Sequence, residues 1–153
     1  MFYTKPVAII GLTALISGLY GCSSSSTQPA ETAELNVWNE PMNCVTGANY
    51  IDGKQVAGTL CATRDFGAYS GKTTEPQIYF SPNNEQAIQK SASDAADGTL
   101  SQWKGNQVLL KCDETLGADY KTVVNRLCRV SINNQPLVSA HINYVRGNED
   151  LEP

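Results

Sequence analysis

Residues 44–61 decide the fold, and they read CVTGANYIDGKQVAGTLC. The Asp52-Gly53 pair at their centre is the strongest short signal for a two-residue hairpin loop, because a type I′ turn needs positive φ at both central residues. With this turn in place, glycine faces glycine, threonine faces threonine, and Cys44 faces Cys61. Like residues oppose each other on almost every rung, which predicts a long antiparallel hairpin with this register.

The hairpin register also predicts a disulfide. Rungs alternate outward from the turn, so Cys44 and Cys61 form a non-hydrogen-bonded pair with Cα atoms about 4.5 Å apart, a spacing that a disulfide accepts. Elimination then pairs Cys112 with Cys128. A structural zinc site is the rival interpretation, but no Cys-x-x-Cys spacing occurs and His141 is the only histidine. Each bridge closes a loop that contributes about 3 kcal/mol by the chain-entropy model.

The rest of the chain predicts short strands and one helix. A loop rich in glycine, serine and threonine follows the hairpin over residues 64–76. The expected strands are residues 77–80, 107–112, 127–132 and 137–145, with a turn at residues 133–136. The predicted class is α+β, a small and mostly antiparallel sheet with one helix packed on it and two disulfides. The alternative is an all-β sandwich or barrel.

The helix is expected over residues 84–97. Residues 81–85 read Ser-Pro-Asn-Asn-Glu, which supplies capping residues, and Gly98 is a natural stop. The apolar residues that fall on one face at helical spacing are Ile88, Ala92, Ala95 and Ala96. Leu100 and Trp103 are expected to cover the end of this helix.

The first 22 residues predict export. A short charged start and an apolar stretch of about 15 residues, too short to span a bilayer comfortably, form a secretory signal over residues 1–21. The stretch ends in Leu-Tyr-Gly-Cys22, which resembles the lipobox of bacterial lipoproteins. That resemblance implies that Cys22 carries acyl chains, which give stable anchoring. Ser23 is not the aspartate associated with inner-membrane retention, so the resemblance implies the bacterial outer membrane.

The expected organisation has three further parts. Residues 22–34 form the lipidated cysteine and a flexible tether rich in serine and threonine, since they contain no aliphatic residue larger than alanine. Residues 35–147 form the disulfide-stabilised globular domain, and residues 148–153 form an acidic tail.

Composition excludes several classes of function. The chain has 153 residues, 41% of them hydrophobic, and a net charge of −4, so it lacks the basic balance of a nucleic-acid-binding protein. Residues 67–73 resemble a phosphate-binding loop, but the glycine spacing is one residue short and a strand follows instead of a helix. We therefore expect no nucleic acid, nucleotide, metal or other cofactor.

No complete catalytic set is present either. His141 shares a strand face with Ser139 and Asn143, where a solvated histidine is the expected role. Asp113 and Glu114 are adjacent on a strand and point to opposite faces, so they are not expected to act as a pair. No Gly-x-Ser-x-Gly motif marks a nucleophilic serine. The sequence thus predicts a protein that is not an enzyme.

The build of the chain resembles a known lipoprotein family. A polar tether, four cysteines, a helix and a strand ending in Cys112, with Leu-Cys128 beyond it, are similar to the Rcs stress-sensor lipoproteins of the outer membrane. This resemblance implies stress sensing and disulfides between non-consecutive cysteines. The latter implication conflicts with the pairing predicted from the hairpin.

The expected function is the binding of another envelope protein by a small domain that a lipid anchors to the outer membrane. The sequence is compatible with envelope assembly, secretion-system support and stress sensing. It is also compatible with a periplasmic and with a surface-exposed position of the domain. Phe66, Tyr69 and Lys72 in the loop over residues 64–76 are the candidate partner-binding residues. The alternative function is an inhibitor or defence protein acting on a foreign enzyme, such as a lysozyme or a phage component.

Overall fold

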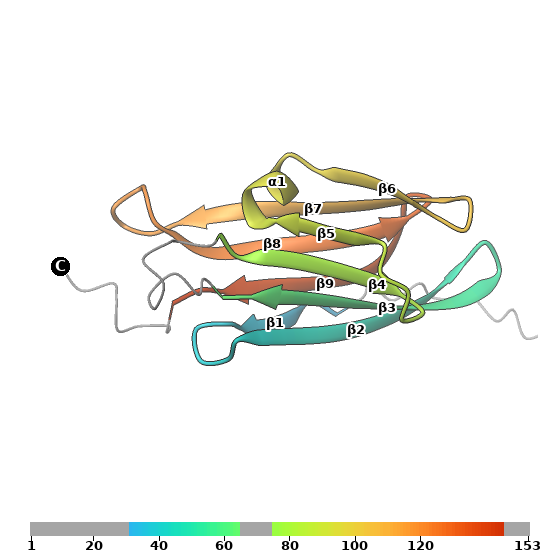
Figure 1. The fold of residues 1–153 in the computed structure, drawn as a ribbon, viewed down its shortest axis with the longest axis horizontal. Helices are drawn as coiled ribbons and strands as arrows, with labels where there is room; N and C mark the ends of the chain where they lie inside the picture. The colour runs from blue at the N-terminus through green and yellow to red at the C-terminus, as the bar shows by residue number, and fades with distance from the viewer. Residues whose placement is uncertain (1–30, 65–74, 146–153) are drawn as a thin grey trace, which may run out of the picture.

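Two β-sheets packed face to face form the structure, a computed structural model that describes residues 31–64 and 75–145 (Figure 1). One sheet has the strand order β2-β3-β4-β5, and the other has the order β1-β9-β8-β7-β6. The strands are β1 (Ala33–Asn36), β2 (Met42–Ile51), β3 (Lys54–Thr63), β4 (Gln77–Pro82), β5 (Ile88–Ser91), β6 (Thr99–Trp103), β7 (Asn106–Leu116), β8 (Val123–Ile132) and β9 (Gln135–Asn143). Across these described ranges the pairing of β1 with β9 is parallel and every other pairing is antiparallel.

The β2–β3 hairpin has the predicted register. Its rungs run from Met42 opposite Thr63 to Ile51 opposite Lys54, and each predicted like-with-like rung is present. The hydroxyls of Thr46 and Thr59 lie 2.9 Å apart across the strands, as a hydrogen-bonded cross-strand pair. The local sequence therefore suffices to set this part of the fold.

Four turns of one type connect strands at one end of the sandwich. Each has two successive residues with positive φ, the geometry of a type I′ turn, which matches the right-handed twist of the flanking strands. The four pairs are Asp52-Gly53, Asn83-Asn84, Lys104-Gly105 and Asn133-Asn134. In Figure 1 all four turns lie at the right, and we call this end the turn end.

The predicted α+β class is wrong, and the all-β alternative describes the structure. The region expected to be a helix over residues 84–97 contains β5 and α1 (Ala92–Ala96), which has five residues and is the one helix within the described ranges. The side chain of Ser91 caps α1 by accepting a hydrogen bond from the Asp94 amide. Asn83 and Asn84, interpreted as helix-capping residues, instead adopt positive φ and turn the chain back into β5.

Most of the apolar residues that were expected on one face of the helix are buried, although most of this region is not helical. Ile88, Ala92 and Ala95 are at most 3% exposed, although Ile88 belongs to a strand and not to a helix. Leu100 and Trp103, expected to cover the helix end, lie in β6, and Leu100 is 63% exposed. The apolar spacing therefore identified core positions without identifying the secondary structure around them.

The core fills the space between the sheets. Its largest fully buried side chains are Phe80, Leu35, Leu60, Ile78, Leu110, Ile132, Leu137 and Ile142. Two glycines on facing rungs, Gly47 and Gly58, bring β2 and β3 very close to β9. A Cβ atom at Gly47 would lie 2.5 Å from the carbonyl oxygen of Leu137. At Gly47, β2 therefore packs directly against the backbone of β9, and at Gly58, β3 packs against the side chains of Leu137 and Phe80.

Candidate functional site

Both predicted disulfides are present, Cys44–Cys61 and Cys112–Cys128, each with Cα atoms 4.0 Å apart. The pairing is consecutive, so the non-consecutive pairing implied by the Rcs resemblance is wrong. The two bridges lie in different environments. Cys112 and Cys128 are at most 1% exposed in the core, whereas Cys44 is exposed on the outer face of the four-stranded sheet.

His141 lies on β9 and points away from the core. Its Nδ1 is 3.3 Å from Oδ1 of Asn125 on the neighbouring strand β8. Asn143, two residues further along the same face, donates to the carboxylate of Glu34. Among the residues that the structure describes, this amide is the hydrogen-bonding contact of His141, while Glu34 lies opposite it on β1 and binds Asn143. The arrangement is that of a polar ladder across strands.

Asp113 and Glu114 point to opposite faces of β7, as the strand period requires. Asp113 pairs with Arg129 on the exposed outer face. Glu114 pairs with Arg126, whose Nη2 lies 2.6 Å from Oε1 of Glu114. Each carboxylate therefore has its own arginine on β8, and the two do not form a cooperating pair.

The Arg126 pair is the buried one. The Arg126 residue is 7% exposed, and its guanidinium lies 5.1 Å from the centroid of the Tyr144 ring. Burial raises the pKa of the Tyr144 hydroxyl. This cluster lies at the end of the sandwich opposite the turn end, where Glu114 approaches the end of β7.

Replacing Glu114 by alanine is expected to lower the free energy of unfolding by about 2 kcal/mol, because it leaves a buried guanidinium unpaired. Asp113→Ala is the matched control, since it removes the adjacent carboxylate from an exposed pair, which contributes at most about 1 kcal/mol. Urea unfolding of the two variants measures the difference. Equal losses of unfolding free energy would contradict the assignment of the Arg126–Glu114 pair as the more stabilising of the two.

Several predicted site residues lie outside the described ranges. They are Cys22 and the three candidate partner-binding residues Phe66, Tyr69 and Lys72. Within residues 31–64 and 75–145, no three histidine, cysteine or acidic side chains gather as a metal site requires. The helix found in those ranges is also too short to cross a bilayer.

The turn end joins the two sheets through polar side chains. The carboxylate of Asp52 accepts hydrogen bonds from Asn133 at 2.7 Å and from Gln135 at 3.2 Å, which connects the β2–β3 turn with the β8–β9 turn. Asn133 also donates to Asn106 at the start of β7. Asn83 accepts from the backbone amide of Ala57 at 3.1 Å. These bonds fix the turns relative to one another.

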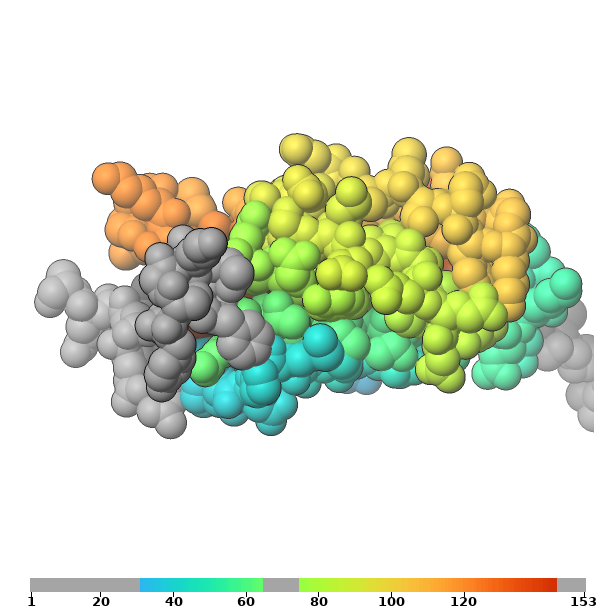
Figure 2. Space-filling model, in the orientation of Figure 1, coloured from blue at the N-terminus to red at the C-terminus, as the bar shows by residue number. Residues whose placement is uncertain are grey.

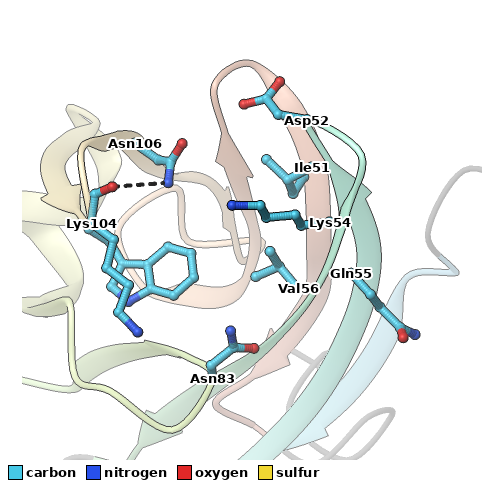
Figure 3. Close-up of a pocket in the computed structure, with 9 residues that line it drawn as sticks. Ile51, Asp52, Lys54, Gln55, Val56, Asn83, Lys104 and Asn106 are labelled. Atoms are coloured by element: carbon cyan, nitrogen blue, oxygen red, sulfur yellow. Dashed lines mark hydrogen bonds between the residues drawn. The ribbon is translucent and has the colours of Figure 1, made fainter.

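A pocket of about 350 Å³ opens between three of these turns (Figure 3). Its lining residues come from β2, β3, β6 and β7 and from the turns between strands; they are Ile51, Asp52, Lys54, Gln55, Val56, Asn83, Trp103, Lys104 and Asn106. Ile51 and Val56, at most 5% exposed, supply apolar surface. Figure 3 shows the Lys54 side chain extending into the pocket, whereas Asp52 and Gln55 point away from it.

Glu85 fixes one wall of the pocket. Its carboxylate accepts from the Lys104 ammonium at 2.6 Å and from the Trp103 indole N–H at 3.0 Å. These two donors hold the pKa of the Glu85 carboxyl below its usual value. The Lys104 ammonium also lies 5.3 Å from the centroid of the Trp103 ring. The tryptophan is therefore held in place beside the pocket.

The second candidate surface is the free edge of β2, which we call the β2 edge. β2 has ten residues, pairs with β3 on one side only, and contains no charged residue and no proline. In the hairpin register, Cys44, Thr46, Ala48 and Tyr50 occupy non-hydrogen-bonded rungs, so their backbone N–H and C=O groups point away from β3. Figure 2 shows β2 (cyan to teal) along the lower margin of the molecule.

Two asparagines occupy part of the β2 edge. Asn43 accepts a hydrogen bond from the Cys44 amide at 2.9 Å, and Asn49 accepts one from the Tyr50 amide at 2.8 Å. Thr46 and Ala48 lie between these two asparagines, and their outward amides have no hydrogen-bond acceptor within the described part of the chain. A window of free backbone groups therefore lies at the middle of an uncharged strand.

Neither of these surfaces is evident from the sequence alone. The hairpin was predicted correctly, but its position at the edge of a sheet depends on which strands pair with which, and this is not a local property. The pocket residues lie far apart in the chain, and Lys104-Gly105 was not recognised as a turn. Comparison with protein-family models, with curated proteins and with solved structures finds no match for this chain.

Proposed function

We propose that the protein is a lipid-anchored binding module of the bacterial outer membrane, without catalytic activity, which binds an envelope protein through the β2 edge. The observation that supports this proposal most directly is the pair of outward amides at Thr46 and Ala48. An exposed and uncharged edge strand is a template for an added strand, and proteins normally protect such edges with charges or proline. This edge has neither.

Strand addition at the β2 edge would use complete backbone pairs. Thr46 and Ala48 each offer an outward N–H and an outward C=O, the groups that an added strand pairs with. The side chains beside them on the outer face are small and uncharged, and they include Thr59 and Ala57 on β3. The fitting occupant is an extended segment of a partner that has free amides at the pairing positions and no charge facing this surface.

Ala48→Pro tests the β2 edge. Proline removes only the outward amide, and it is tolerated where the N–H of an edge strand faces solvent, so the hairpin should remain intact. We expect crosslinked pull-downs from membranes to recover one resident envelope protein with the wild type, and at least tenfold less of it with Ala48→Pro. Ala48→Ser is the matched control, because it keeps the amide, and Cys22→Ala tests the need for the anchor.

Two further measurements make this test specific. Thermal unfolding of Ala48→Pro should remain within a few degrees of the wild type. In the complex, hydrogen exchange of the Thr46 and Ala48 amides should slow by at least tenfold. Equal recovery with Ala48→Pro, or recovery of a second copy alone, would overturn the proposal. Recovery of a lytic enzyme or a phage protein through the same edge would overturn the resident-partner part and favour an inhibitor.

A further inference from the structure

We infer that the pocket at the turn end binds an acidic sugar, that is, a pyranose ring that bears a carboxylate or a phosphate. This inference is independent of the β2 edge, because the outward amides of Thr46 and Ala48 take no part in the pocket. Three properties of the pocket support it: the volume, the apolar surface, and the balance between hydrogen-bond donors and acceptors.

The pocket offers donors and has few free acceptors. The carboxylate of Asp52 is occupied by Asn133 and Gln135, and Figure 3 shows it turned away from the cavity. The carbonyl oxygens of the Asn83 and Asn106 side chains already accept from the Ala57 amide and from Asn133. A ligand here therefore binds the pocket chiefly as an acceptor, with its own donor groups turned to solvent.

The free donors converge on the cavity. Lys54 has no hydrogen-bond or ion-pair partner within residues 31–64 and 75–145, and its ammonium extends into the pocket. The amide nitrogen of Asn83 is likewise turned toward the cavity, and no described residue accepts from it. An anionic oxygen is the natural acceptor for an unpaired ammonium, and such charge-assisted hydrogen bonds are stronger than neutral ones.

The rest of the lining suits the body of a sugar ring. Trp103 is held by Glu85, so its aromatic surface needs no ordering when a ligand binds. Ile51 and Val56 add apolar surface, which can contact the C–H groups of a pyranose. A volume of about 350 Å³ lies at the small end of the range for ligand pockets, which fits one ring and not an extended ligand.

Titration of the purified full-length protein in neutral detergent tests this inference. The probes are glucuronate, glucose 6-phosphate and glucose, followed by calorimetry and by tryptophan fluorescence at low ionic strength. We expect saturable binding of the two acidic sugars, at least tenfold tighter than that of glucose. Lys54→Gln should weaken the binding of the acidic sugars at least tenfold, because it removes the free ammonium.

Lys121→Gln is the matched control, since it removes one lysine charge from the turn after β7, at the opposite end of the sandwich. Equal weakening by both lysine variants would reduce the effect to general charge and overturn the inference, as would equal binding of glucose. Vesicles of phosphatidylethanolamine and phosphatidylglycerol form a last arm. Lys54-dependent binding to these vesicles, without binding of free acidic sugars, would assign the pocket to lipid headgroups and overturn the sugar assignment.

Discussion

Loss of the buried Cys112–Cys128 bridge is expected to destabilise the protein by about 4–5 kcal/mol. The bridge spans 16 positions of sequence, and the chain-entropy model gives about 3 kcal/mol for a loop of this size. Both sulfur atoms also lie in the core, so the double variant Cys112→Ala/Cys128→Ala adds a cavity that costs at least about 1 kcal/mol. This sum is comparable with the entire stability of a small domain.

The second disulfide supplies the matched control. Cys44–Cys61 spans 17 positions, so its entropic contribution is nearly the same, but Cys44 is exposed on the outer face and alanine there leaves no core cavity. Urea unfolding should therefore rank the stabilities as wild type, then Cys44→Ala/Cys61→Ala, then Cys112→Ala/Cys128→Ala. An inverted order would contradict the placement of the two bridges.

Partial reduction gives a check without mutation. A low concentration of dithiothreitol should open Cys44–Cys61 first, because a thiolate reaches the exposed bridge and not the buried one. Alkylation followed by mass spectrometry identifies which cysteines were released. Labelling of Cys112 and Cys128 before the outer pair would mean that the core opens more readily than the packing of the two sheets implies.

The register of the β2–β3 hairpin and the Cys44–Cys61 bridge could be predicted because both follow from one local turn. Asp52-Gly53 specifies its own conformation, and the rungs then follow by counting. The pairing of Cys112 with Cys128 is then deduced by elimination. Each of these predictions needed no knowledge of how distant strands are arranged.

The prediction of the fold class failed because of a single pair of residues. Asn83-Asn84 forms the same kind of turn as Asn133-Asn134, with both residues at positive φ. The alanine-rich stretch with helical spacing that follows the first pair predicts a helix cap there. Asparagine favours both helix caps and left-handed turns, so its presence could not decide between the two. Tertiary packing decided, since Ile88 pairs with Phe80 in the sheet.

The two candidate surfaces depend on contacts across the whole chain. β2 became an edge strand because β9 pairs with β1 and β8 and not with β2. The pocket formed because the turns at residues 52–53, 83–84 and 104–105 meet at one end of the sandwich. Neither arrangement leaves a local pattern, so a single sequence could not reveal them.

Gly47→Ala is expected to destabilise the protein by about 3 kcal/mol. The added Cβ would lie 2.5 Å from the Leu137 carbonyl oxygen, a distance that real Cβ contacts do not reach, and 3.0 Å from the Val138 Cβ, which is a tight contact. Relief requires movement of the β9 backbone, which β1 and β8 hold on both sides. Overpacking against a fixed backbone falls at the upper end of the usual cost of about 1–3 kcal/mol.

Gly117→Ala is the control for the change from glycine to alanine itself. The one tight contact of its Cβ would be a methyl group of the Val124 side chain at 3.1 Å, while Asp119 and Thr122 would lie at ordinary contact distance, so we expect a loss below about 1 kcal/mol. Gly58→Ala should fall between the two, because the atoms nearest to its Cβ would belong to the side chains of Phe80 and Leu137 and not to the backbone. Denaturant unfolding of the three variants therefore measures how close the two sheets approach. If Gly47→Ala were as stable as Gly117→Ala, β2 would lie further from β9 than the structure places it. The position of the free amides at Thr46 and Ala48 would then have to be revised.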